Sequence, residues 1–172
     1  MAADATMLAM SSPSEHRVAI QTEDFDLGVE TARLRAADGE IGAVVGFVGT
    51  VREASGGQAI RMMELEHYPG MTEAAIERMI DAAFARFDIR AARVIHRVGP
   101  LAPRAQIVLV LVASRHRGQA FQACEFLMDY LKTQAPFWKK EHTEAGAHWV
   151  DARVADDAAL ARWGIDSGNS GS

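Results

Sequence analysis

The stretch "AQIVLVLVA" (residues 105–113), followed by "SRHRGQAF" (114–121), decides the fold of this chain. The first run is apolar throughout, which is typical of a strand buried on both faces, so we expect it to be the central strand of a sheet. A helix is expected over about 117–134, and it must end before Pro136, because proline has no amide donor and restricts its predecessor. Its predicted inner face carries Phe121, Cys124, Leu127, Met128 and Leu131.

Outward from this unit, strands and helices alternate without strict βαβ order, which predicts an α+β fold with largely antiparallel pairing. Thr72 is the expected N-cap of the second helix in the chain. Strand 92–99 is expected to pair with the central strand through "PLAPR". The remaining expected elements are strands over 42–51, 59–68 and 148–154 and helices over 27–36, 73–87 and 156–164.

The chain has 172 residues and a formal net charge of -5, which argues for a single soluble domain and against broad nucleic-acid binding. We expect a flexible N-terminal arm over 1–16, one catalytic domain over 17–166 and a disordered Gly/Ser-rich tail over 167–172. The single cysteine, Cys124, cannot form an internal disulfide and is expected to be an inert core residue. With no signal-peptide pattern and no run long enough to span a membrane, we predict a cytoplasmic protein.

The segment "MDYLKTQAPFWKKEH" (128–142) contains every lysine of the chain, while all other basic residues are arginines. A lysine ammonium can lose its proton when it is desolvated, so it can act as acid, base or nucleophile, whereas arginine keeps its charge. Lys132 is expected near the end of a helix, and Lys139 after a Pro-Phe-Trp turn that folds back over it. Spacing alone gives about even odds between this interpretation and one in which Lys132 only complements the C-terminus of the helix while Lys139 and Lys140 are solvated.

Two further groups can hold an anion. Arg115, His116 and Arg117 stand where a strand leads into a helix N-terminus, although three polar residues can equally begin a surface helix. Arg52 follows a strand whose two glycines indicate either close approach of a ligand or only a bulge.

The remaining histidines give no strong signal. The pair His96-Arg97 fits either a pocket or a cross-strand contact, and the sequence does not separate the two readings. His142 and His148 match no zinc spacing, so we expect no metal and no cofactor.

Three segments together resemble the large, catalytic subunit of molybdopterin synthase: "LEHYPGMTE" (65–73), "VIHRVG" (94–99) and "MDYLKTQAPFWKKE" (128–141). The resemblance extends from about 42 to 153. It implies an α/β hammerhead-like fold with an additional antiparallel sheet. It also implies sulfur transfer to cyclic pyranopterin monophosphate, which yields the molybdopterin dithiolene. The implied sulfur donor is a small ubiquitin-like partner with a C-terminal Gly-Gly thiocarboxylate, bound to a homodimer of the large subunit in a heterotetramer.

Position by position, the resemblance assigns catalytic roles to Lys132 and Lys139. It implies that the anionic substrate is bound by Arg52, His116, Arg117 and Arg153, the last of them resembling an arginine donated across the dimer interface. Candidate apolar walls of a channel for the partner's tail are Phe47, Met128, Phe137 and Trp138. Two other readings of the same residues stay open at this point: a scaffold that docks a ubiquitin-like protein, and a hydrolase or transferase of phosphorylated small molecules.

Overall fold

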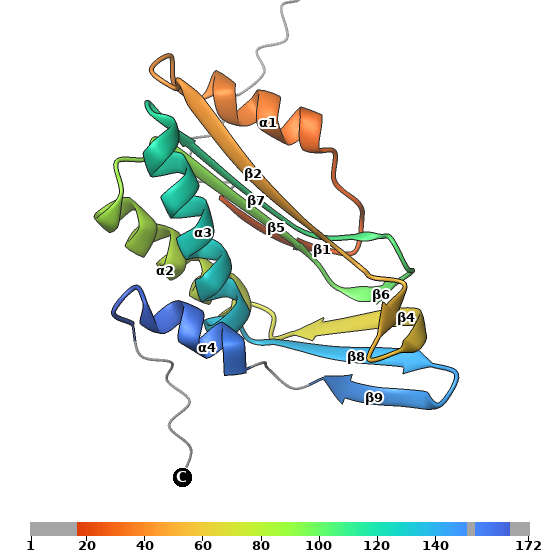
Figure 1. The fold of residues 1–172 in the computed structure, drawn as a ribbon. Helices are drawn as coiled ribbons and strands as arrows, with labels where there is room; N and C mark the ends of the chain where they lie inside the picture. The colour runs from red at the N-terminus through yellow and green to blue at the C-terminus, as the bar shows by residue number, and fades with distance from the viewer. Residues whose placement is uncertain (1–16, 151–153, 166–172) are drawn as a thin grey trace, which may run out of the picture.

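The chain folds into two β-sheets with helices on both faces of the first (Figure 1). The structure is a computed structural model and describes residues 17–150 and 154–165. The four-stranded sheet has the order β1-β5-β7-β2, and only the β1–β5 pair is parallel. Its strands are β1 (Val18–Gln21), β5 (Ala91–Arg97), β7 (Gln106–Ser114) and β2 (Ala43–Thr50). This mixed, largely antiparallel arrangement confirms the predicted α+β class.

Strand β7 is central to the first sheet, as its apolar run predicts. Successive side chains of a strand point to opposite faces, and here both faces are covered. Val110 packs in the cluster formed with α2 (Met71–Arg86) and α3 (Arg117–Gln134), while Leu109 and Leu111 pack on the other side with Phe25 and residues near α1 (Leu27–Ala36). Burial on both sides explains why the run contains no polar alternation.

Helix α3 begins and ends where the sequence predicts, but the prediction that Phe121 lies on its inner face is wrong. Phe121 is 61% exposed, whereas Leu127 is fully buried. Cys124 is buried in the same cluster, and burial raises the pKa of its thiol to about 11, so the thiol stays protonated near neutral pH. Its expected role as an inert core residue is confirmed.

Helix α2 begins two residues earlier than expected, and its N-cap is Gly70 rather than Thr72. Gly70 has φ 80°, a conformation that glycine adopts without strain, and its N–H donates to Glu73 Oε2 at 2.7 Å. Thr72 is buried inside the first turn, where its hydroxyl donates to the carbonyl of Pro136. The predicted cap therefore ties α2 to the segment after α3 instead.

The second sheet has five strands, and three of them, two short and one long, are not predicted from the sequence: Ala54–Ser55, Gly99–Leu101 and Phe137–Thr143. The residues Phe137–Thr143 form β8, which pairs with β4 and β9. The prediction of a turn at Pro-Phe-Trp is therefore wrong, because the chain is an extended strand from Phe137 onward. The sheet has the order β3-β4-β8-β9, and β6 also pairs with β4. Its other strands are β3 (Ala54–Ser55), β4 (Gln58–His67), β6 (Gly99–Leu101) and β9 (Gly146–Val150).

The last described element is α4 (Val154–Ala161), which overlaps the helix expected over 156–164. The predicted arm (1–16) and tail (167–172) lie outside the described residues, as does Arg153. In the part of the chain that the structure describes, no helix combines the length and the hydropathy needed to cross a membrane.

Candidate active site

A cleft of about 560 Å³ opens where the C-terminal end of α3 meets the junction of the two sheets. Its walls come from β2, β4, β5, β7, β8 and α3, so segments far apart in the sequence converge on it. Arg52, Lys132 and Lys139 all line it. The structure therefore brings both predicted catalytic lysines and one predicted substrate-binding arginine to a single cavity.

The three cations reach the cavity from three different elements. Lys132 lies in the last turn of α3, Lys139 lies on β8, and Arg52 follows the end of β2. Among the described residues, Arg52 and Lys132 form no ion pair, and both line the cavity. Uncompensated positive charge gathered in a cleft attracts an anion even when the whole chain is acidic.

Lys139 is held in place by a buried carboxylate. Glu141 stands two residues further along β8, on the same face, and its side chain is only 3% exposed. Its Oε1 lies 3.4 Å from Lys139 Nζ, and its Oε2 lies 3.7 Å from Nε2 of His148 on β9. A buried carboxylate needs such a partner, and in return it limits the positions that the lysine ammonium can take.

Three of the four predicted channel residues line the cavity: Phe47, Met128 and Phe137. Trp138 does not, because successive residues of β8 point to opposite faces of the sheet. Its ring packs instead against Tyr68, with the ring centroids 5.5 Å apart. Lys140 points the same way, and its Nζ lies 5.3 Å from the centre of the Trp149 ring.

The glycines of β2 accommodate the protein's own side chains. A Cβ on Gly46 would lie 2.8 Å from Leu111 Cδ2, and one on Gly49 would lie 2.8 Å from Val108 Cγ1. The register of β2 against β7 shifts between Gly49 and Thr50. An irregularity of the strand therefore adjoins Gly49 but not Gly46, and it precedes the turn that carries Arg52 into the cavity.

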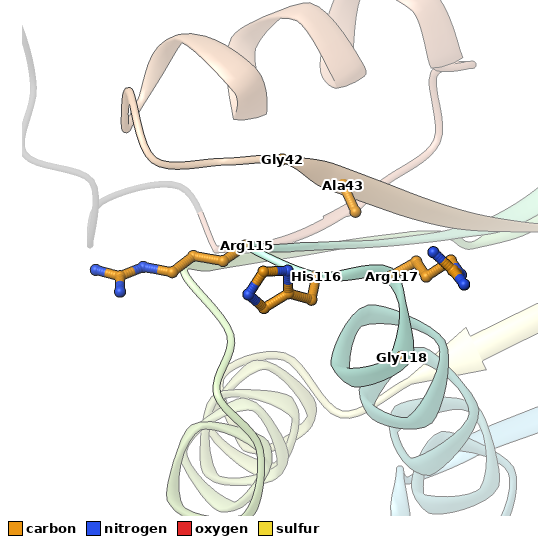
Figure 2. Close-up of a pocket in the computed structure, with 6 residues that line it drawn as sticks. All are labelled: Gly42, Ala43, Arg115, His116, Arg117 and Gly118. Carbon is orange, nitrogen blue, oxygen red and sulfur yellow. The ribbon is translucent and has the colours of Figure 1, made fainter.

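His116 and Arg117 lie at the opposite end of α3, in a separate shallow hollow with Gly42, Ala43, Arg115 and Gly118 (Figure 2). The side chains of Arg115 and Arg117 extend in opposite directions there, with His116 between them. Arg117 opens α3 and Lys132 lies in its last turn, so at about 1.5 Å per residue they are roughly 22 Å apart along the helix axis. Within one chain, the predicted set of anion-binding residues is therefore divided between two places.

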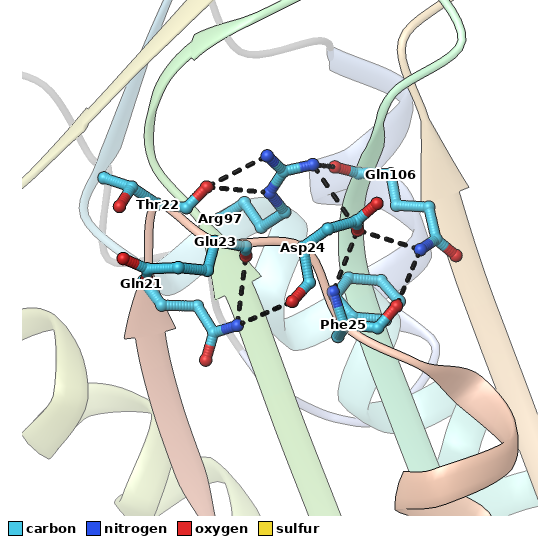
Figure 3. Close-up of polar contacts among 7 residues, drawn as sticks. All are labelled: Gln21, Thr22, Glu23, Asp24, Phe25, Arg97 and Gln106. Carbon is cyan, nitrogen blue, oxygen red and sulfur yellow. Dashed lines mark hydrogen bonds and ion pairs between the residues drawn. The ribbon is translucent and has the colours of Figure 1, made fainter.

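The structure separates the two residues of the pair His96-Arg97. Arg97 donates to the carbonyl oxygens of Thr22 and Gln106 and lies 3.4 Å from Asp24, so it ties the loop before α1 to β5 and β7 (Figure 3). His96 points to the other face of β5 and lines the cavity with the lysines. The alternation of β5 around buried Val94 is the signal that could have placed His96 there.

No group of three or more histidine, cysteine or acidic side chains in the described residues is arranged to hold a metal ion. The donors that line the main cavity are mostly cationic, which suits an anionic organic ligand rather than a cation.

The fold is that of the MoaE proteins. Residues 20–134 match the MoaE protein family, and the chain belongs to that family. It is 61% identical over 153 residues to the molybdopterin synthase catalytic subunit of Ralstonia nicotianae, covering 89% of this chain and 87% of that protein.

Solved structures agree with this assignment. The molybdopterin biosynthesis MoaE protein of Burkholderia ambifaria superposes with a TM-score of 0.77 at 55% identity, covering 88% of this chain and 99% of that one. Molybdopterin synthase from Staphylococcus aureus superposes with a TM-score of 0.72 at 30% identity, covering 77% of this chain and 96% of that one.

Proposed function

We propose that this chain is the catalytic subunit of a molybdopterin synthase. It is a sulfurtransferase that converts cyclic pyranopterin monophosphate into the dithiolene of molybdopterin. The observation that carries the proposal is the convergence of Arg52, Lys132 and Lys139 on one cavity in a chain of this family. Both expected reactants are anions, namely a cyclic phosphate and the thiocarboxylate at the end of a Gly-Gly tail. Three cations in one cleft match that charge.

The tail of a small ubiquitin-like partner reaches the lysines along the apolar wall formed by Phe47, Met128 and Phe137. Only glycine passes a narrow channel without steric cost, which suits a Gly-Gly terminus. At the inner end, Lys132 stabilises the anionic adduct that forms as the thiocarboxylate sulfur attacks the pterin side chain, and it transfers protons there. Water then cleaves the acyl C–S bond, which leaves the sulfur on the pterin and a carboxylate on the partner's tail. Lys139, fixed by Glu141, orients the substrate. Trp138 has no part in this channel.

His116 and Arg117 take part in the same site only if they come from a second copy of the chain. Along the helix axis, Arg117 lies about 22 Å from Lys132 and about 16 Å from Met128, the nearest residue of α3 that lines the cavity of the same chain. A homodimer that places the start of one α3 at the cavity of its partner completes the anion site, and Arg153 is expected to arrive in the same way. The active assembly is then a homodimer with one small subunit for each cavity.

Reconstitution tests this function. The purified chain is mixed with cyclic pyranopterin monophosphate and the thiocarboxylated partner, and the dithiolene product is measured. The expected result is product formation that depends on the partner's thiocarboxylate. Equal product from free sulfide without the partner would contradict the tail mechanism. Turnover of simple phosphate esters without any partner would favour the rival hydrolase reading.

A further inference from the structure

Among the residues that line the main cavity, His96 offers a kind of contact that the cations cannot. Its Nδ1 lies 2.8 Å from the carbonyl oxygen of Arg97. A carbonyl oxygen only accepts hydrogen bonds, so Nδ1 carries the hydrogen of the contact. In a neutral imidazole, the other nitrogen, Nε2, then holds a lone pair and acts as an acceptor.

The surroundings keep this imidazole neutral. Burial above all, together with the nearby charges of His67 and Lys132, lowers the pKa of His96 to about 4, despite the opposing effect of the hydrogen bond to Arg97. At neutral pH the ring is therefore uncharged. It is also a weak base, so its role is to accept a hydrogen bond rather than to remove a proton.

The ring is held in a fixed orientation with Nε2 available. It stacks on Phe137 with the centroids 3.8 Å apart and the planes at 18°. Within the described part of the chain, Nε2 has no hydrogen-bond partner, yet it is not among the fully enclosed side-chain atoms that lack one. Nε2 therefore keeps some accessible surface, and His96 is one of the residues that line the cavity. A contact made by a preorganised ring costs little conformational entropy.

The other ionisable side chains that line the cavity, Arg52, Lys132 and Lys139, only donate when charged. They can bind a phosphate or a thiocarboxylate, but they cannot recognise a donor group. A pterin carries ring N–H, amino and hydroxyl donors in addition to its phosphate. We propose that His96 is a substrate-binding residue of this cavity, which accepts a hydrogen bond at Nε2 from an N–H or O–H group of the pyranopterin. This inference rests on the proposed function, since that function supplies the pterin.

Two variants of the full chain separate the acceptor from the ring. His96→Phe keeps an aromatic ring to stack on Phe137 and removes the acceptor, whereas His96→Gln places an amide oxygen close to the position of Nε2. In reconstituted synthase, His96→Phe is expected to raise the KM for cyclic pyranopterin monophosphate roughly 3- to 10-fold, with kcat within about 2-fold. His96→Gln is expected to stay within about 2-fold of the wild type in both constants.

His142→Gln is the matched control, because His142 pairs with Glu64 and is not among the residues that line the cavity. Its KM is expected to equal that of the wild type. An unchanged KM in His96→Phe overturns the proposal. An equal rise in the Phe and Gln variants also overturns it, since that result reports loss of the imidazole's shape rather than of an acceptor.

A direct measurement keeps the proposal testable if His96→Phe does not fold. In ¹⁵N NMR spectra of the wild-type chain, His96 is expected to show the tautomer protonated at Nδ1, and its Nε2 signal is expected to move upfield when cyclic pyranopterin monophosphate is added. A signal that does not move with saturating precursor overturns the proposal. If Nε2 responds but the wild type forms no dithiolene with its partner, then the proposed function fails while His96 remains a pterin contact.

Discussion

The two ends of α3 carry similar residues but differ in what surrounds them. At the C-terminal end, Lys132 joins Lys139, Arg52 and neutral His96 around a cleft of about 560 Å³ with apolar walls. At the N-terminal end, His116 and Arg117 stand exposed on a shallow hollow, and Arg115 pairs with Glu40. The comparison shows that positive charge alone does not define a site. The C-terminal end of α3 lines a cleft that can hold a ligand. The N-terminal end presents its charged side chains on an open surface.

The largest effect is expected from mixing two inactive chains. If Arg117 serves the cavity of a second copy, Lys132→Ala and Arg117→Ala chains pair to give mixed dimers with one intact site. Random pairing then restores roughly a quarter of the wild-type activity, because about half of the dimers are mixed and each has one working site of two. The measurement is dithiolene formation after the two purified variants are unfolded and refolded together.

The matched control mixes Lys132→Ala with Lys139→Ala. Both lysines line the cavity of the same chain, so every mixed site lacks one of them and no activity is expected. If the first mixture stays as inactive as this control, the two ends of α3 do not meet across a dimer.

A smaller effect is expected at the carboxylate that fixes Lys139. In Glu141→Gln the ion pair at 3.4 Å is lost from a side chain that is 3% exposed. Activity is expected to fall roughly 10-fold and the free energy of unfolding by about 1–3 kcal/mol. Assays of product formation and urea unfolding measure the two quantities.

Glu144→Gln provides the control, because Glu144 pairs with Arg61 at a site where its side chain is 76% exposed. That variant is expected to change stability by less than about 0.5 kcal/mol and to leave activity unaltered. If Glu141→Gln and Glu144→Gln change activity and the free energy of unfolding equally, Glu141 does not position Lys139.

The pH dependence of stability reports on His96. Its pKa is about 4 in the folded chain and about 6.5 when unfolded, so below pH 6.5 the unfolded chain binds a proton that the folded chain does not. The stability that the neutral His96 ring contributes is complete above pH 6.5 and is lost as the pH falls to about 4, with a total of roughly 3 kcal/mol. The free energy of unfolding, measured with urea between pH 4 and 7, is expected to change less steeply with pH in His96→Phe than in the wild type. Parallel slopes would mean that His96 titrates normally.

Much of the first sheet follows from local pattern, because its elements are amphipathic or wholly apolar. The run that forms β7 and the helix that stops before Pro136 are of this kind. The sequence does not predict strand β8, because charged residues, Lys139 and Glu141, stand on its inner face. The strand therefore lacks the alternation of apolar and polar residues that marks a half-buried strand. The distance between Arg117 and Lys132 follows from helix length alone. The convergence of Arg52 and His96 on the lysines depends on how two sheets join, which no local pattern encodes.

The central claim is that sulfur transfer takes place at Lys132, at the C-terminal end of α3. The most direct measurement is a single-turnover assay of Lys132→Arg with thiocarboxylated partner and cyclic pyranopterin monophosphate, together with partner binding by calorimetry. Arginine keeps the charge but does not release a proton at neutral pH, so partner binding is expected to be retained and no dithiolene is expected to form. Full product formation by this variant would contradict the role of Lys132.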